Sequence, residues 1–347
     1  MRIEKFTNLY RDVTKEGTKI PQEKYCLTGQ FPIVDQGQRV IAGWWNDDAG
    51  IFKNVPAIIF GDHTRAIKYM EQPFFIGADG VKILRPTNIK DNPKYLYYAL
   101  QAAKIPNLGY SRHFKVVKEL QICIYSRDEQ NEIVRVLEKI DYLIEQRYAE
   151  TTYLDQLVKS RFIELFGDPE TNPKGWTRQR LDQICENLDS RRVPITSTNR
   201  KAGNYPYYGA SGIVDYVKDY IFDEDILLIS EDGANLVMRS TPIAFSVSGK
   251  VWVNNHAHVV RFESKATQKY IEICFALTDI SGSITGTAQP KLNQAKLNAM
   301  MFCVPPIELQ EQFATFVEQT DKSKLAAQKG LQELEILKKS LMQQYFG

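Results

Sequence analysis

Apolar residues in the stretch 128–166 recur at alternating steps of four and three, the pattern of a helix that packs along one seam. The pattern returns 180 residues later, where Gln310 repeats Gln130 and Leu337 repeats Leu157. We therefore predict two long helices, at 126–167 and 306–347, each with about 38 helical residues and a length of roughly 57 Å. Their seam or partner-docking positions are Ile133, Leu137, Ile140, Ile144, Leu154, Val158, Phe313, Val317, Leu331, Leu334 and Leu341.

Neither helix is expected to be stable alone, because its apolar stripe must be covered, and the other helix is the natural cover. The first helix meets Gly167 and then Pro169, which end helices, and the stretch 168–176 reads as a linker. More than a hundred residues follow before the second helix begins. The two helices can therefore pack antiparallel, and for seam residues such as Ile144, Leu154 and Leu334 we expect packing inside the chain.

The remaining stretches, 1–125 and 177–305, are rich in short β-like runs. In both, an apolar run enters a turn, at 57–60 before Gly61-Asp62 and at 226–229 before Glu231-Asp232-Gly233. Helices are predicted at 93–103 and 267–278. The expected fold is thus two tandem α/β (α+β) globular domains with two long antiparallel coiled-coil helices, in a pseudo-twofold arrangement.

Composition agrees with packed domains, since 43% of the residues are hydrophobic and 11% aromatic. The five cysteines are scattered without a CxxC pair, which argues against a disulfide framework and a zinc site. No apolar run approaches the ~20 residues of a membrane span, and the first residues lack the apolar core of a signal peptide. We expect a cytoplasmic protein that is not exported.

The net charge of +2 is small, but its distribution is uneven. Residues 126–170 carry six Lys/Arg against eleven Asp/Glu, residues 174–201 carry seven against three, and residues 102–118 hold four cations and no acid. Basic segments beside an acidic scaffold are what a phosphate-binding face would show, although ordinary variation along a neutral protein explains them as well.

Motifs for catalysis are missing from the sequence. It contains no GxxxxGK[ST], HExxH, EF-hand loop or GxSxG, and no adenine-methylation motif. His256 and His258 share one side of a predicted strand without a nearby Cys or acidic ligand, so we expect a loop or core role and no metal. Asp232, Asn254, Asn255 and His256 suit turns. We expect a non-catalytic chain.

Several strings, taken with their order and the two-copy layout of the chain, resemble the specificity subunits of Type I restriction-modification enzymes. They are SRFIELFGDP at 160–169, NPKGW at 172–176, YPYYGASG at 205–212, EDGANL at 231–236 and GKVWVNNHAHVV at 249–260, with weaker versions at 31–37 and 60–64. The resemblance covers essentially the whole chain.

The resemblance implies two target-recognition domains that each read one half of a split double-stranded DNA sequence. It implies that the helix pair fixes the gap and docks two methyltransferase subunits, which restriction (endonuclease/translocase) subunits join. Cofactors are expected only in those partners, namely S-adenosylmethionine, Mg and ATP. Two alternatives stay open: a coiled-coil scaffold or adaptor that does not bind DNA, and the recognition subunit of a related single-complex restriction enzyme.

Base reading requires Arg, Lys, Asn, Gln or acids on protruding loops, with further cations on phosphates. In the first domain the candidates are Gln36, Arg39, His63, Arg65, Lys68, Arg112, His113 and Lys115. In the second they are Arg191, Arg192, Tyr208, Ser211, Asn235, Lys250, Gln289 and Lys291. For each one, the alternative is a solvated surface residue.

Overall fold

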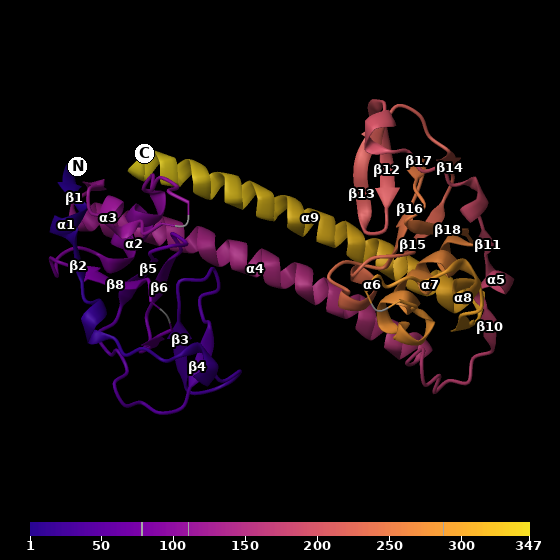
Figure 1. Cartoon of the computed structure of the whole chain (residues 1–347), viewed down its shortest axis with the longest axis horizontal. Helices are drawn as coiled ribbons and strands as arrows, with labels where there is room; N and C mark the ends of the chain where they lie inside the picture. The colour runs from indigo at the N-terminus through magenta and orange to yellow at the C-terminus, as the bar shows by residue number, and fades with distance from the viewer. Residues whose placement is uncertain (78, 110, 287) are drawn as a thin grey trace. The chain divides into compact units, whose positions relative to one another are not determined.

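The computed structural model describes residues 1–77, 79–109, 111–286 and 288–347. Two compact units divide the chain: Met1–Tyr148 with Lys329–Gly347, and Ala149–Gln328. Each unit holds one globule and a part of both long helices, α4 (Arg127–Phe166) and α9 (Ile307–Phe346), which have 40 residues each (Figure 1). No described helix is both long and apolar enough to cross a membrane.

Helix α4 begins and ends at identifiable caps. At its start the Glu129 carboxylate accepts the Ser126 N–H at 2.9 Å, and the Ser126 hydroxyl oxygen accepts the Glu129 N–H at 3.4 Å, a capping box. At its end Gly167 takes φ +78°, a left-handed conformation that a side chain would strain, and its N–H bonds back to the Ile163 carbonyl at 2.8 Å.

The segment predicted as a linker also folds back to cap α4. The Trp176 indole N–H donates to the Phe166 carbonyl at 2.9 Å, and the Lys174 ammonium donates to the Glu164 and Leu165 carbonyls at 2.7 and 2.9 Å. Asn172 holds Trp176 in place by accepting its N–H at 2.9 Å. These bonds satisfy carbonyls that the last helical turn leaves unpaired.

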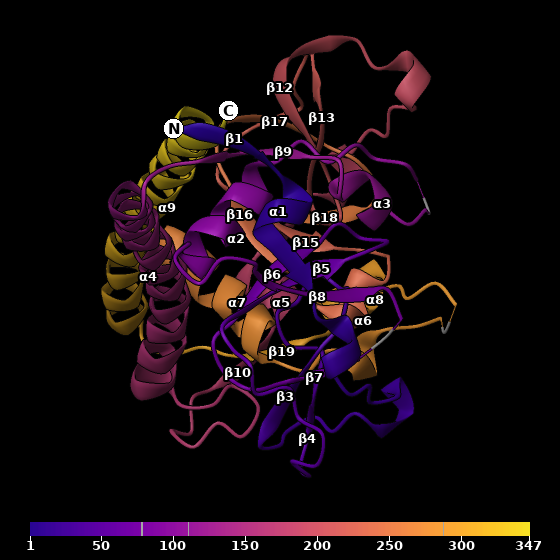
Figure 2. The same cartoon turned by 90° about the vertical axis from the view of Figure 1, so that its left-hand side faces the viewer.

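Contacts between α4 and α9 show that the two helices are antiparallel. Within each unit, the residue number of the partner on α9 falls as that on α4 rises (Figure 1 and Figure 2). The first unit contributes the ion pair Asp141–Lys338 at 2.5 Å and the hydrogen bond from Tyr148 to Glu335 at 2.9 Å. The second contributes the ion pair Asp155–Lys324 at 2.5 Å and the ring pair Phe162–Phe313 at 5.5 Å.

Among its described residues, the first unit contains three small sheets and three short α-helices. Its four-stranded sheet has the order β2-β8-β5-β6, from β2 (Tyr10–Asp12), β8 (Val81–Pro86), β5 (Ala57–Gly61) and β6 (Ile67–Met70). The second sheet, β4-β3-β7, comprises β4 (Gly43–Trp45), β3 (Phe31–Val34) and β7 (Phe75–Ile76). Strands β1 (Arg2–Lys5) and β9 (Gln121–Ile124) form the third, and the helices are α1 (Phe6–Leu9), α2 (Pro93–Ala102) and α3 (Phe114–Val117).

The second unit repeats this order of strands, with one additional strand at the edge of its second sheet. Sheet β11-β18-β15-β16 is built from β11 (Glu186–Asn187), β18 (Ala257–Arg261), β15 (Ile226–Ser230) and β16 (Ala244–Val247). Sheet β13-β12-β17-β14 is built from β13 (Gly212–Val217), β12 (Ala202–Gly209), β17 (Lys250–Val253) and β14 (Phe222–Asp223), and β10 (Arg178–Arg180) pairs with β19 (Met301–Cys303). The short helices are α5 (Leu181–Ile184), α6 (Asn235–Met238), α7 (Lys265–Leu277) and α8 (Gln294–Asn298).

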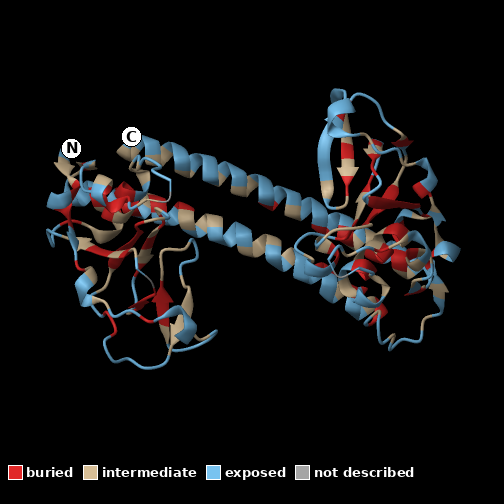
Figure 3. Cartoon of the chain, viewed as in Figure 1, coloured by how far each residue is buried: buried red, intermediate tan, exposed pale blue. Residues whose placement is uncertain are grey.

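Buried residues lie in the sheets, in α2 and α7, and where the long helices meet each globule (Figure 3). In the first unit, Ile133 and Leu137 of α4 share a core with Leu341 and Phe346 of α9. In the second, Val158 of α4 shares a core with Phe313 and Val317 of α9. The predicted fold class of tandem α/β domains with long helices is confirmed.

Candidate nucleic-acid interface

The end of the central strand is built alike in both units. After β5 the Asp62 N–H donates to the Gly80 carbonyl at 2.7 Å, and the Asp62 carbonyl accepts the His113 N–H at 2.9 Å. After β15 the Glu231 N–H donates to the His256 carbonyl at 2.9 Å, and the Glu231 carbonyl accepts the Leu292 N–H at 2.8 Å. These matching bonds make residues 107–113 and 285–292 equivalent, and we name them the first and second strand-end loops.

The first strand-end loop turns at Gly109, whose φ of +68° favours glycine and whose N–H bonds to the Asn107 side chain at 3.1 Å. Arg112 is exposed immediately before the bond that ties the loop to Asp62. Tyr110 lies outside the described residues. The loop therefore presents a cation beside the end of the central strand.

The second strand-end loop closes as a tight hairpin. Thr285 and Lys291 exchange both backbone hydrogen bonds, at 2.8 and 2.7 Å. Gly286 has φ +80°, and a Cβ there would lie 2.6 Å from the Gln289 carbonyl oxygen, so the turn requires glycine. Gln289 is exposed in the turn, and Thr287 lies outside the described residues. Lys291 occupies the position equivalent to Arg112 and reaches the Glu231 carboxylate at 3.1 Å.

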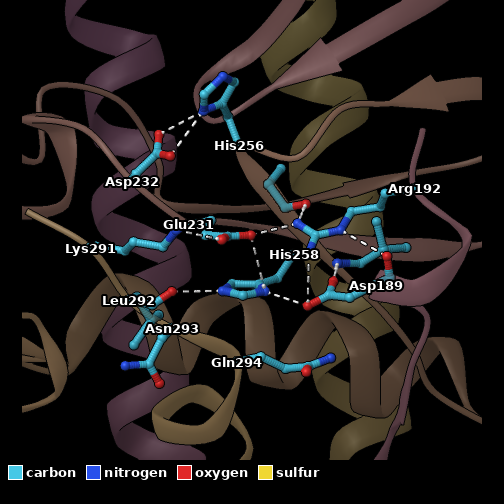
Figure 4. A network of polar contacts seen from close by, with 12 residues as sticks. Asp189, Arg192, Glu231, Asp232, His256, His258, Lys291, Leu292, Asn293 and Gln294 are labelled. Carbon is cyan, nitrogen blue, oxygen red and sulfur yellow. Dashed lines mark hydrogen bonds and ion pairs between the residues drawn. The ribbon is translucent and has the colours of Figure 1, made fainter. Parts of the chain in front are cut away.

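A cluster of charged side chains lies beside the end of this loop (Figure 4). The Asp189 carboxylate contacts His258 Nδ1 at 2.6 Å, and His258 Nε2 contacts the Leu292 carbonyl at 2.7 Å. The Arg192 guanidinium bonds to Glu231 at 2.6 Å and also lies 3.3 Å from Asp189. The cluster thus connects η3 (Asp189–Arg191), β15, β18 and the second strand-end loop.

Both carboxylates of the cluster are held ionised. Burial alone would raise the pKa of Asp189, but bonds from His258 and the Val259 N–H, with the nearby Arg192 charge, bring that pKa below its ordinary value. Burial acts the same way on Glu231, and contacts with Arg192, His258 and Lys291 lower its pKa. The second strand-end loop therefore contacts a cluster of ionised carboxylates that are paired with nearby cations.

Other predicted residues of the second unit are spread over several elements. Arg191 pairs with Glu224 at 2.6 Å, and Tyr208 packs against Phe245 with ring centroids 5.9 Å apart. The Asn235 side chain closes its own loop by bonding to residues 240 and 241. Lys250 is exposed over the Tyr220 ring at 4.8 Å, and Ser211 is exposed in the β12–β13 turn.

In the first unit the exposed candidates are Arg39, Arg112 and Lys115. Gln36 and His63 are half-buried neighbours, because the Gln36 side chain accepts the His63 N–H at 3.3 Å. Arg65 has a φ of +61° and donates to the Ile105 carbonyl at 3.3 Å.

The structure corrects three predicted DNA contacts. Lys68 is buried and donates to the Asp35 carbonyl at 2.7 Å, and burial lowers the pKa of its ammonium. His113 is buried, and both of its ring nitrogens are hydrogen-bonded. The Arg192 guanidinium is paired with Asp189 and Glu231 and donates to the Ala257 carbonyl. Each side chain satisfies buried polar groups, so none can reach a ligand in this conformation.

Residues expected in turns take that role. Asn254 accepts the His256 N–H at 2.8 Å, and His256 faces the Asp232 carboxylate at 2.9 Å. Asn255 is exposed in the same turn. Asp189 and its pairing with His258 were not predicted, because 69 positions separate the two residues and no local pattern connects them.

Seam positions divide between buried and half-buried. Ile133, Leu137, Ile140, Val158, Phe313 and Val317 are buried, whereas Ile144, Leu154, Leu331, Leu334 and Leu341 are half-buried. Outside the seam, Leu157 and Leu337, which correspond in the repeat, are 48% and 46% exposed. Each helix therefore carries an exposed leucine at the same repeat position.

Comparison with known proteins adds relatives of both sequence and fold. A putative type I restriction enzyme specificity subunit of Haemophilus influenzae is 32% identical over 167 residues, which are 48% of this chain and 40% of the relative. The chain spans about half the length of the curated relatives it matches. The crystal structure of a Type I system S subunit from M. genitalium has a TM-score of 0.64 at 16% identity and covers 100% of this chain and 96% of its own.

A second solved chain, from a structure on complex assembly and conformational transition of the type I R-M system, gives a TM-score of 0.54 at 14% identity. It covers 99% of this chain and 97% of its own. The family model for the Type I restriction modification DNA specificity domain matches twice, over residues 10–152 and 173–336. Since these two matches take up most of the sequence, the chain belongs to the family of Type I restriction-modification DNA specificity proteins.

Proposed function

We propose that this chain is the DNA-recognition subunit of a Type I restriction-modification complex, with each globule reading one half of a bipartite target. The observation that carries the proposal is the pair of strand-end loops. They follow the equivalent strand in the two four-stranded sheets, present Arg112 or Lys291 at matching positions, and otherwise differ in sequence. Two loops that are held in the same way but differ in sequence suit two domains that read different half-sites.

In this proposal residues 1–125 and 177–305 are the target-recognition domains, 126–167 and 306–347 are the long helices, and 168–176 is the linker. Each 40-residue helix is about 60 Å long, more than one ~34–36 Å turn of B-DNA. The helix pair is proposed to set the gap at about a turn to a turn and a half.

The same helices are proposed to dock two methyltransferase subunits, because an exposed leucine recurs at the same repeat position in both. Two equivalent contact points suit two copies of one partner. Methylation and cleavage, with S-adenosylmethionine, Mg and ATP, would reside in the methyltransferase and restriction subunits, in the cytoplasm.

The test is to express the chain with its neighbouring methyltransferase and sequence the modified genome. A split motif of two unlike halves with a fixed gap is the expected result. Binding of the purified complex to that motif should weaken linearly in log–log form as salt rises, by about 0.9 per phosphate contacted. An adaptor that binds only protein would give neither a motif nor a salt slope, and that outcome would overturn the proposal.

A further inference from the structure

The connection between β3 and β4 differs in length from its counterpart between β12 and β13. In the first unit eight residues, 35–42, join the two strands, and in the second unit two residues, 210–211, do so (Figure 1). The two connections are equivalent, because the carbonyls of Val34 and Tyr208 each accept the N–H of the residue that follows β7 or β17, at 2.9 and 3.0 Å. The first unit therefore has a loop, which we name the β3–β4 loop, where the second has a tight turn.

Both connections start from the same kind of anchor. The Thr64 hydroxyl, in the turn after β5, donates to the Gln36 carbonyl. In the second unit the Ser230 hydroxyl, at the end of β15, donates to the Ala210 carbonyl at 2.5 Å. Gln36 and Ala210 each lie two residues after the equivalent positions in β3 and β12. The first residues of the β3–β4 loop are thus held at the end of the central strand.

A buried lysine adds an anchor that an aromatic contact replaces in the second unit. Lys68 lies on β6 with a side chain only 3% exposed, and its ammonium donates to the Asp35 carbonyl at 2.7 Å and lies 3.4 Å from the Asp35 carboxylate. The β5–β6 and β15–β16 registers place Phe245 at the equivalent position, where its ring packs against Tyr208. Because a desolvated ammonium needs acceptors, Lys68 fixes the start of the long loop.

The tip of the β3–β4 loop presents one cation to solvent. Gln38 and Val40 border grooves whose other wall includes Asp141 and Ile144 of α4. Arg39, between them, is exposed and borders neither of these grooves, and no described residue bonds to its guanidinium. The tip therefore offers a guanidinium that a ligand can reach.

The β3–β4 loop and the first strand-end loop are tied to one turn. The His63 N–H donates to the Gln36 side chain at 3.3 Å, and the carbonyl of the preceding residue, Asp62, accepts the His113 N–H at 2.9 Å. Both loops therefore leave the same end of the central strand, which is the end that the proposed function places against DNA.

We propose that the β3–β4 loop is a second reading loop for the first half-site, in which Arg39 contacts a guanine and Lys68 is a positioning residue. The inference rests on the proposed function and deepens it. A guanidinium can donate two hydrogen bonds to O6 and N7 of guanine, the commonest specific contact in the major groove. A loop that is fixed before binding loses less conformational freedom when it docks. The second domain reads its half-site without such a loop.

The test uses the complex with its methyltransferase and duplexes that carry the modified split motif, changed at one base pair at a time. Arg39→Ala should weaken binding to the intact motif by about tenfold to a hundredfold and abolish discrimination at one G·C pair of the first half. Discrimination at every position of the second half should stay as in the natural complex. Arg11→Ala removes an exposed arginine on the edge strand β2, and as the matched control it should change neither quantity.

Lys68→Met tests the positioning role, because it removes the ammonium and keeps an apolar side chain of similar length. It should reduce discrimination at the same G·C pair and spare the second half, a pattern that a general loss of stability would not produce. Since Lys68 acts through Arg39, the double variant should discriminate at that pair no less than Arg39→Ala alone. Circular dichroism checks that each variant is folded, and Arg39→Ala decides the reading role by itself if the Lys68 variant is not.

Several outcomes would overturn the inference and leave the proposed function standing. Unchanged binding by Arg39→Ala is one, and an equal loss for all sequences, which marks a phosphate contact, is another. Full discrimination at the G·C pair in Lys68→Met, or a loss of second-half discrimination in either single variant, would be a third. Failure of the natural complex to bind any split motif would overturn the proposed function as well, so the two failures are distinguishable.

Discussion

Phe166, at the end of α4, packs against Tyr270 of α7 with ring centroids 4.8 Å apart. The repeat makes the same pair in the first unit, where Phe346 at the end of α9 packs against Tyr95 of α2 at 5.3 Å. Each long helix thus leaves the globule that precedes it in sequence and ends in the core of the other unit. The two long helices therefore end in equivalent aromatic contacts, one inside each unit, which agrees with the close repeat of their last turns.

Replacing Phe166 with Ala should destabilise the second unit by about 3–5 kcal/mol, because the side chain is buried among Phe162, Tyr270 and Phe313. Phe346→Ala should cost less, since Phe346 is only half-buried. Urea unfolding followed by circular dichroism measures both. Ile163→Ala, on an exposed position of the same turn, is the control and should change stability by no more than about 0.5 kcal/mol. Equal losses for Phe166 and Ile163 would contradict this assignment.

Inserting one heptad into each long helix, after Tyr148 and after Gln328, should widen the recognised gap and leave both half-sites unchanged. These positions correspond in the repeat and mark the boundary between the units. Seven residues add about 10 Å, or roughly three base pairs, and keep the seam in phase. Methylome sequencing reads the motif directly. An insertion in α4 alone should abolish modification, because it breaks the register with α9. Altered half-sites at unchanged spacing would contradict the proposal that the helix pair sets the gap between them.

Arg112→Ala and Lys291→Ala should each weaken recognition of a different half-site, by about 1–3 kcal/mol for a base contact. The reason is their equivalent exposed positions at the two strand-end loops. Competition binding with duplexes changed in one half at a time is the measurement. Lys322→Ala removes an exposed cation on α9 that pairs with Glu318 and serves as control. If both variants lose affinity equally for all sequences, the two cations contact phosphates only.

Leu157→Asp and Leu337→Asp should each impair docking of one methyltransferase copy and leave the fold intact, because both side chains are about half exposed outside the seam. A charge on an apolar contact is costly to desolvate, so the affinity of that site should fall by at least about tenfold. Native mass spectrometry of the complex counts the copies. Each single variant should retain one copy and the double variant none. Two copies on the double variant would place the docking surface elsewhere.

Sequence periodicity predicted the helices well because a heptad is local: a residue and its seam neighbours lie within seven positions. Residue type, from which the DNA contacts were predicted, failed for Lys68, His113 and Arg192, since a polar side chain bonded to a buried carbonyl or carboxylate has the same sequence signature as an exposed one. The prolines and glycine of residues 168–176 predicted only a linker, whereas Lys174 and Trp176 cap α4. The partners of such side chains are set by tertiary structure, and periodicity carries no information on them.

Asp189→Asn should lower stability at neutral pH and flatten its dependence on acid. The pKa of Asp189 lies below its ordinary value in the folded chain, so the carboxylate contributes stability above the unfolded pKa of ~3.9, and this contribution is lost as pH falls through the folded value. Removing one partner of a buried charge pair costs about 3–5 kcal/mol. Urea unfolding from about pH 7 down to about pH 3 should therefore show a steep acid loss for the natural chain and a shallow one for the variant. Asp321→Asn, at an exposed position on α9, is the control and should keep the natural slope. An identical acid slope in Asp189→Asn would mean that other carboxylates carry the acid sensitivity, and that the charged cluster beside the second strand-end loop does not depend on its ionised aspartate.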